Sequence, residues 1–208
     1  MSTAVASRDL TRDAILDAAD RLMARYGFRK MSMDDVAKEA GVSKRSIYVH
    51  FENKEDVGLS SIGRVVQKVH DELLVVAESS SPPLTKLSLM LERRVVGRIE
   101  QVRDYAHSLD ELFEIVRPAY MARRAKFFEI ESELIQGVLF EGKELGEIEY
   151  DDLQLTAETL LFATNAFLPY SLSVRELGAM EDIVRRLHDM NRVLLRGIST
   201  TNTTGNSK

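Results

Sequence analysis

Hydrophobic and polar positions along this chain repeat almost everywhere with the period of an α-helix. In residues 9–26 the apolar side chains recur every three or four positions, so they fall on one helix face. They are Ile15, Ala18, Ala19, Leu22, Met23 and Tyr26. Gly27 follows and is suited to ending a helix. Strand-like alternation is scarce, so the pattern predicts an all-α fold.

Two short helices are predicted next. The first spans about residues 33–40, with Ser32 as its N-cap and Asp35 completing a capping box. Gly41 breaks it, and Ser43 caps the next helix, which ends near residue 51.

A long helix is predicted from residue 54 to about 78, with Asn53 as its N-cap, and residues 79–83 form a loop. The remaining predicted helices span about 84–100, 104–114, 118–139, 151–170 and 174–198. Pro118 is placed in a first turn, where proline is tolerated. Residues 199–208 are rich in Thr, Asn, Ser and Gly, which is typical of a disordered tail.

Composition narrows the possible classes. The chain has 208 residues, is 44% hydrophobic and contains no cysteine, which excludes disulfides and thiolate sites. No signal peptide is visible, and the longest uncharged run, residues 159–174, is broken by Asn165 and Pro169. It is shorter than the roughly 18–20 apolar residues that span a bilayer. We therefore expect a cytoplasmic protein.

The charge is distributed unevenly. The whole chain carries −5, yet its first 54 residues hold ten basic and eight acidic side chains, which leaves −7 on the remainder. Local charge decides whether phosphate is attracted, so this asymmetry permits a DNA-binding head on an acidic body.

Residues 27–57 contain the most informative pattern. Two short helices meet at Gly41-Val42, and the small side chain of Ala37 lets them approach closely. The apolar contacts are expected from Val36, Ala40, Val42 and Ile47. This is the layout of a helix-turn-helix. The second helix would then present a free face to a major groove, made of Lys44, Arg45, Ser46, Tyr48, Val49 and His50.

Over about residues 9–57 the sequence resembles the DNA-binding domain of TetR-like (TetR/AcrR-type) transcriptional regulators. The resemblance is carried by the Ala-Gly-Val-Ser turn at 40–43, the Ile-Tyr-x-His-Phe segment at 47–51 and Asn-Lys-Glu at 53–55. It implies a three-helix DNA-binding domain at 8–54 and a larger helical effector-binding and dimerisation domain at 55–198. Beyond residue 57 the likeness is one of architecture only.

The resemblance also assigns roles within the first domain. Lys44, Arg45 and Ser46 would face base edges. Tyr48, His50 and Lys54 would hold the phosphate backbone, and Ser32 and Ser43 would add backbone contacts. Arg45 departs from the family, which often has a small residue there, and could pair with guanine. The alternative is an ordinary solvated helix face, with Lys54 a plain first-turn lysine.

The two last helices carry apolar stripes that suit a four-helix bundle between two copies. The expected dimer-interface residues are Leu160, Leu161, Thr164, Leu168, Ile183, Leu187, Met190 and Leu194. The alternative is that these stripes face only their own core. A small-molecule effector, drug-like or lipid-like, is expected in the same body. The candidate contacts are His107, Tyr120, Phe128, Asn165 and Tyr170.

An enzyme is not expected. The four histidines are scattered, and no HExxH, GxSxG, P-loop or GxGxxG motif occurs. No cofactor or metal is expected, although Asp104, His107 and Glu111 share a helical face that could hold a metal ion. The sequence thus predicts a ligand-released repressor that binds a palindromic operator as a homodimer. The alternative is a DNA-bound interaction protein whose body recruits a protein partner.

Overall fold

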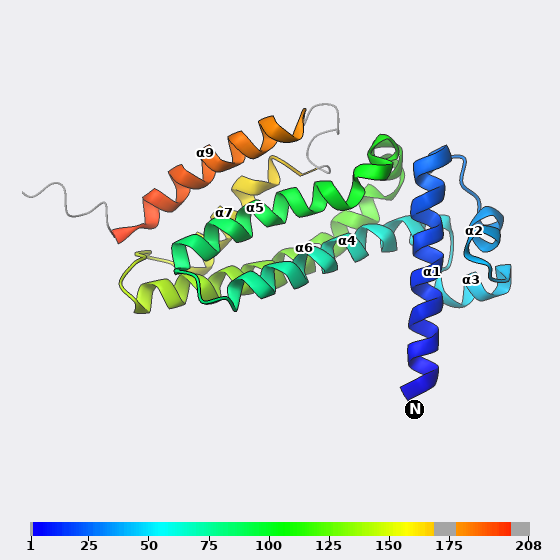
Figure 1. Cartoon of the computed structure of the whole chain (residues 1–208), viewed down its shortest axis with the longest axis horizontal. Coiled ribbons are helices and arrows are strands. Elements are labelled where there is room, and N and C mark those ends of the chain that lie inside the picture. The colour runs from blue at the N-terminus through cyan, green and yellow to red at the C-terminus, as the bar shows by residue number, and fades with distance from the viewer. Residues whose placement is uncertain (1, 169–177, 201–208) are drawn as a thin grey trace, which may run out of the picture. The chain divides into compact units, whose positions relative to one another are not determined.

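The computed structural model describes residues 2–168 and 178–200, with side chains from residue 9 onward. Within these ranges every regular element is a helix, apart from one isolated antiparallel bridge between Ile148 and Ser199 (Figure 1). The predicted all-α class is therefore confirmed. No helix in the described ranges is long and apolar enough to cross a membrane.

The chain forms two compact units, each built from two segments. The first unit contains Met1–Val65 and Val102–Ala122, and the second contains Val66–Gln101 and Arg123–Lys208. The predicted DNA-binding segment 8–54 lies within the first unit, which also takes in the segment that begins at Val102.

The first unit is built around helix α1, Ser2–Tyr26. Helices α2 (Met33–Ala40) and α3 (Lys44–His50) pack against α1 and against each other. The unit also contains the first part of α4 (Lys54–Ala77), the 3-10 turn η1 (Arg103–Tyr105) and the start of α6 (Ala106–Glu144). The fully buried side chains of this core include Ile15, Leu16, Met23, Phe28, Ile47, Phe51, Leu109 and Leu112.

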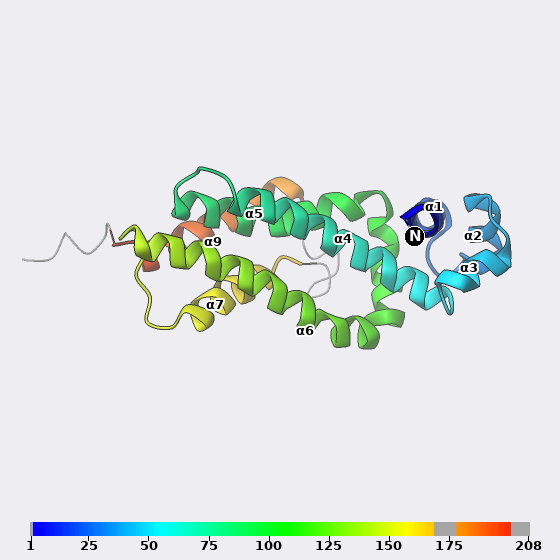
Figure 2. The ribbon, with the colours of Figure 1, turned by 90° about the horizontal axis from the view of Figure 1, so that it is seen from below.

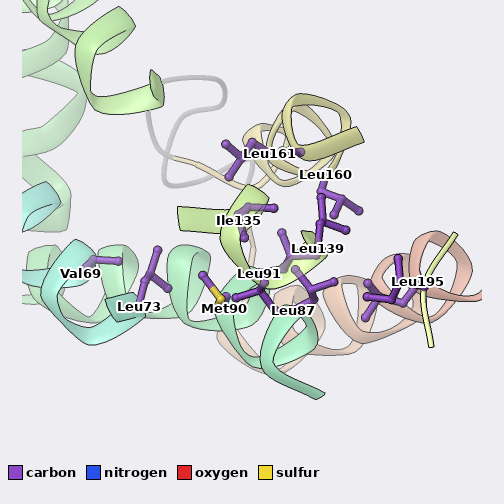
Figure 3. Close-up of a cluster of buried hydrophobic side chains, with 13 residues drawn as sticks. Val69, Leu73, Leu87, Met90, Leu91, Ile135, Leu139, Leu160, Leu161 and Leu195 are labelled. Carbon is purple, nitrogen blue, oxygen red and sulfur yellow. The ribbon is translucent and has the colours of Figure 1, made fainter. Parts of the chain in front are cut away.

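The second unit contains α5 (Pro83–Val102), α7 (Leu153–Asn165) and α9 (Met180–Ile198), with the remaining parts of α4 and α6. Its core draws buried leucine, valine, isoleucine and methionine side chains from all five helices (Figure 3). Helix α9 lies along α5, as both ribbon views show (Figures 1 and 2). His188 Nε2 is 3.0 Å from Glu92, and Asn191 donates to the Ser88 carbonyl at 3.3 Å.

Helix α6 differs from the prediction. Pro118 was expected in the first turn of a helix, but α6 runs without a break from Ala106 to Glu144 and contains Pro118 in its interior. A proline there removes the N–H that would bond the Glu114 carbonyl. Both residues are exposed, so water can satisfy that carbonyl.

The predicted tail also begins differently. Ser199 bridges Ile148, and the Thr200 N–H donates to the Glu147 carbonyl at 3.1 Å. The Thr200 hydroxyl donates to the Gly146 carbonyl at 2.8 Å. These two residues are thus paired with the segment after α6, and residues 201–208 lie outside the described range.

Candidate nucleic-acid interface

Helix α2 begins as the sequence predicts. The Ser32 hydroxyl accepts from the Asp35 N–H at 3.2 Å, and the Asp35 carboxylate accepts from the Ser32 N–H at 3.1 Å. These bonds complete the capping box. They also stabilise the charged carboxylate, so the hydrogen bonds from Ser32 lower the pKa of Asp35.

The turn between α2 and α3 is fixed by backbone geometry. Gly41 adopts φ +68°, a left-handed conformation that glycine reaches without strain. The Val42 N–H then returns to the Ala37 carbonyl at 3.0 Å, and Ser43 caps α3 by accepting from the Ser46 N–H at 3.1 Å. The turn therefore orients α3 across α2.

Helix α3 has one inner and one outer face. Ile47 is fully buried, and Phe51 just after the helix is buried too. Tyr48 and Val49 are about half exposed, at 50% and 56%, and Lys44 and Arg45 are exposed. The helix thus presents cationic and hydrogen-bonding side chains outward, as a recognition helix requires.

Several of the predicted DNA contacts already have partners within the protein. Lys44 Nζ lies 2.8 Å from Asp34 Oδ1, which raises the pKa of Lys44. The Ser43 and Ser46 hydroxyls are 2.8 Å apart, and the Ser32 hydroxyl donates to Asp35 at 2.6 Å. Ser32 and Ser43 are exposed and also cap the starts of α2 and α3. His50 is half-buried next to Phe51.

Lys54 has a structural role that sequence reasoning did not assign. Its ammonium donates to the carbonyls of Phe28 at 3.3 Å and Arg29 at 3.2 Å. It also lies 4.8 Å from the centre of the Phe28 ring, a cation–π contact. A lysine has three donors, so these bonds leave one for another acceptor. Lys54 thereby fastens the end of the α1 segment to the start of α4.

The domain is also joined to the chain that follows Val102. The Ser108 hydroxyl donates to the Met23 carbonyl at 2.8 Å, and the Arg29 N–H donates to Glu111 at 3.3 Å. The Arg29 guanidinium additionally pairs with Glu114. These residues are more than 80 positions apart, so no local pattern could have indicated the contacts.

A polar cluster joins α1 to α4. Arg64 binds Asp17 and Asp20, each at 2.7 Å. Burial raises the pKa of Asp20 even though Arg64 opposes the shift. Tyr105 of η1 is buried beside this cluster, and burial raises the pKa of its hydroxyl. These ion pairs thus hold α1 against the part of α4 that contains Arg64.

The predicted effector residues fall in both units of the chain. Exposed His107 and buried Tyr120 belong to the first unit, where Tyr120 makes an edge contact with Phe113. Phe128 belongs to the second unit and stacks against Phe162 with ring centres 4.7 Å apart. The remaining two are Asn165, which is buried in the second unit, and Tyr170, which lies outside the described residues.

Asn165 takes part in a buried ionic network that sequence reasoning missed. Arg94 bonds Glu131 at 2.9 Å, Asn165 at 2.9 Å and the Thr164 hydroxyl, and Glu131 also pairs with Arg98. Burial alone would raise the pKa of Glu131, but the two guanidiniums outweigh it and lower that pKa. These five side chains come from three helices, so the network ties α5, α6 and α7 together.

The residues expected at a dimer interface are mostly buried within their own chain. Six of the eight predicted residues are buried in the core of their own chain, and the other two are half-buried against it. The six are Leu160, Leu161, Thr164, Leu168, Ile183 and Leu187, and the two are Met190 and Leu194. Side chains already covered by their own core offer little surface to a partner, so these stripes face inward.

The metal alternative finds no support. Across residues 9–168 and 178–200, no group of three His, Cys, Asp or Glu side chains could hold a metal ion. Asp104 lies in η1, and Glu111 instead accepts the Arg29 N–H.

Comparisons with known proteins agree with this geometry. The family described as "Bacterial regulatory proteins, tetR family" matches residues 15–58. The fatty acid metabolism regulator protein of Bacillus subtilis (strain 168) is 27% identical over 159 residues, covering 72% of this chain and 77% of that protein. The HTH-type transcriptional repressor BepR of Brucella suis biovar 1 is 35% identical over 91 residues, covering 43% of this chain and 42% of BepR. The chain thus spans less than half of BepR.

Solved structures share the fold. A transcriptional regulator from Cytophaga hutchinsonii ATCC 33406 superposes with a TM-score of 0.73 at 19% identity, covering 90% of this chain and 98% of that one. FadR from Bacillus subtilis in complex with stearoyl-CoA gives 0.63 at 20% identity, covering 89% and 98%. Residues 15–58, which contain the helix-turn-helix, thus match the tetR family of bacterial regulatory proteins, and the chain is similar in sequence to a bacterial regulator protein.

Proposed function

We propose that this protein is a ligand-released repressor that binds a palindromic operator in the cytoplasm as a homodimer. The observation that carries the proposal is the outer face of α3, where Lys44, Arg45 and Tyr48 are exposed while Ile47 anchors the helix in the core. Arginine pairs bidentately with guanine, and lysine and tyrosine donate to base edges or phosphates. Such a face fits a major groove.

The dimer requires a surface other than the buried stripes. Helices α7 and α9 still carry exposed apolar side chains: Leu155 at 61%, Phe162 at 56% and Val193 at 68%. Large apolar groups in water favour association because their burial releases ordered solvent. We place the contact with a second copy on this outer face of α7 and α9. Two-fold symmetry would then give two recognition helices for two half-sites.

The effector class follows from the relatives. One is named a fatty acid metabolism regulator, and one solved relative holds stearoyl-CoA. We therefore propose a long-chain acyl-CoA as effector. The half-buried Phe128 ring, which packs against Phe162, offers an apolar contact of the required kind. The effector would release the operator only through its different affinity for the two states of the dimer.

Selection of binding sites from a random duplex DNA library tests the DNA-binding claim. The comparison is the double variant Arg45→Ala/Tyr48→Ala, which alters two outward side chains of α3. Lys54 is left unchanged because its bonds to Phe28 and Arg29 support the fold. Arg117→Ala, at an exposed position of α6 in the same unit as α3, is the matched control. We expect wild type and control to enrich one palindrome that the double variant loses. Equal enrichment by all three proteins would refute the α3 assignment.

Release is tested on the enriched operator. A labelled duplex is titrated with acyl-CoAs of increasing chain length, and the bound fraction is followed by fluorescence anisotropy. We expect release by the long chains and none by free CoA. If a long-chain acyl-CoA binds tightly but leaves the operator bound, the ligand-released mechanism is wrong and the body serves another partner.

A further inference from the structure

An exposed ion pair connects the first turns of α2 and α3. Lys44 Nζ lies 2.8 Å from Asp34 Oδ1 and 3.0 Å from Oδ2. The two side chains are 51% and 70% exposed. A pair this exposed is weak, so a competing anion or base edge can open it. The ammonium of Lys44 therefore has two alternative partners, Asp34 and DNA.

Asp34 is not required for the helix start. The capping box of α2 is made by Ser32 and Asp35, which satisfy each other's backbone N–H groups. The Asp34 carboxylate is therefore available to Lys44 without a cost to the cap. By pairing with Lys44, Asp34 withdraws one positive charge from the face that DNA phosphates would approach, and this weakens non-specific binding.

We propose that Asp34 is a specificity-determining residue of the DNA-binding site, because it neutralises Lys44 on non-matching DNA and releases it where the operator offers a better acceptor. This inference rests on the proposed function. On the operator, Lys44 gains a hydrogen bond to a base edge, such as the O6 or N7 of guanine. On other DNA it gains only a screened phosphate contact, for which Asp34 competes. Asp34 thus weakens non-specific binding more than operator binding.

The substitution Asp34→Asn removes the charge and keeps the shape. Affinities for the operator and for a scrambled duplex are measured over a series of salt concentrations. We expect scrambled-duplex affinity to rise about two- to fivefold, the range of an exposed pair. The slope of log affinity against log salt should steepen by about 0.9 on that duplex, one added phosphate contact. Operator affinity should change less. The specificity ratio, which is operator affinity divided by scrambled-duplex affinity, therefore falls.

Two further variants isolate the pair. Asp34→Glu keeps a carboxylate within reach of Lys44 and should restore the wild-type ratio. Asp110→Asn removes the same charge from an exposed position on α6 of the same unit and should leave the ratio unchanged. If Asp110→Asn has the same effect as Asp34→Asn, only net charge matters and the proposal is overturned.

A double-mutant cycle decides whether Asp34 acts through Lys44. In a Lys44→Ala background, Asp34→Asn should no longer raise scrambled-duplex affinity. An equal rise in scrambled-duplex affinity in both backgrounds would mean that Asp34 repels DNA directly, which contradicts the proposal. No rise in either background would contradict it as well. Failure of wild type to enrich any operator refutes the proposed function itself. An enriched operator with an unchanged ratio for Asp34→Asn refutes only the role of Asp34.

Discussion

At the scale of single residues, Glu131 shows how a charge is kept inside a helical core. Its side chain is 2% exposed and lies between the guanidiniums of Arg94 and Arg98. Removing one partner of a buried pair leaves the other charges uncompensated, so Glu131→Gln should lower the free energy of unfolding by about 3–5 kcal/mol at neutral pH. Glu133→Gln, at an exposed position two residues along the same helix, is the control and should change little. Chemical denaturation measures both.

The same residue predicts a pH dependence. The pKa of Glu131 is lowered in the folded chain, so its charged form contributes stability above its unfolded pKa. That contribution is lost as the pH falls through the folded pKa. We therefore expect wild type to lose stability on acidification more steeply than Glu131→Gln, which has no carboxyl there to titrate. If the melting temperatures of the two proteins fall equally as the pH is lowered below 5, this assignment is wrong.

Arg45 is the residue most open to a direct test of base reading. It is exposed on α3 and occupies a position where the TetR resemblance leads one to expect a smaller side chain. A bidentate arginine–guanine pair discriminates by about 1–3 kcal/mol. Arg45→Ala should therefore relax the operator preference at one base pair in each half-site, measured by repeating the site selection. An unchanged preference would mean that Arg45 contacts no base and is an ordinary solvated cation.

At the scale of elements, helix α4 needs a glycine where it meets its neighbours. A Cβ on Gly58 would lie 2.6 Å from Leu112 Cδ1 and 2.8 Å from Phe28 Cε2, and both of those side chains are fully buried. Overpacking costs about 1–3 kcal/mol, which exceeds the gain of about 1 kcal/mol in helix propensity. Gly58→Ala should therefore lower the melting temperature.

Gly137 provides the matched control for this prediction. It also lies in a helix, but a Cβ there meets nothing within 4 Å. Gly137→Ala should therefore stabilise the protein by about 0.5–1 kcal/mol. Equal effects of the two substitutions would show that backbone propensity, and not close packing at Gly58, controls stability.

The sequence predicted the recognition helices well because their signals are local. Ser32, Gly41 and Ser43 act within four residues of their targets, so their caps and turn could be derived from spacing alone. The prediction for Pro118 was wrong because its signal is not local. Whether a proline starts a helix or lies inside one depends on how the flanking turns pack. The role of Lys54 also depends on residues 25 positions away, which no spacing rule reaches.

At the scale of the whole molecule, periodicity identified the apolar faces but not what covers them. A stripe such as Leu160 and Leu187 looks the same whether it meets its own core or a second copy. Only the packing of α5, α6, α7 and α9 shows that these side chains face inward. The outer face of α7 and α9, where we propose the contact with a second copy, carries both polar and exposed apolar side chains, so a hydrophobic pattern alone does not single it out.

The assembly prediction follows from that outer face. Leu155→Glu combined with Val193→Glu places two charges on exposed positions of α7 and α9, where burial against a second copy would cost each charge its hydration. We expect the variant to sediment as a monomer and wild type as a dimer. Val75→Glu, at a position of α4 that is 70% exposed, should leave the dimer intact. Because one protomer can reach only one half-site, the double variant should lose the palindrome and still contact a half-site weakly. A variant that stays dimeric would place the two-fold contact elsewhere on the second unit.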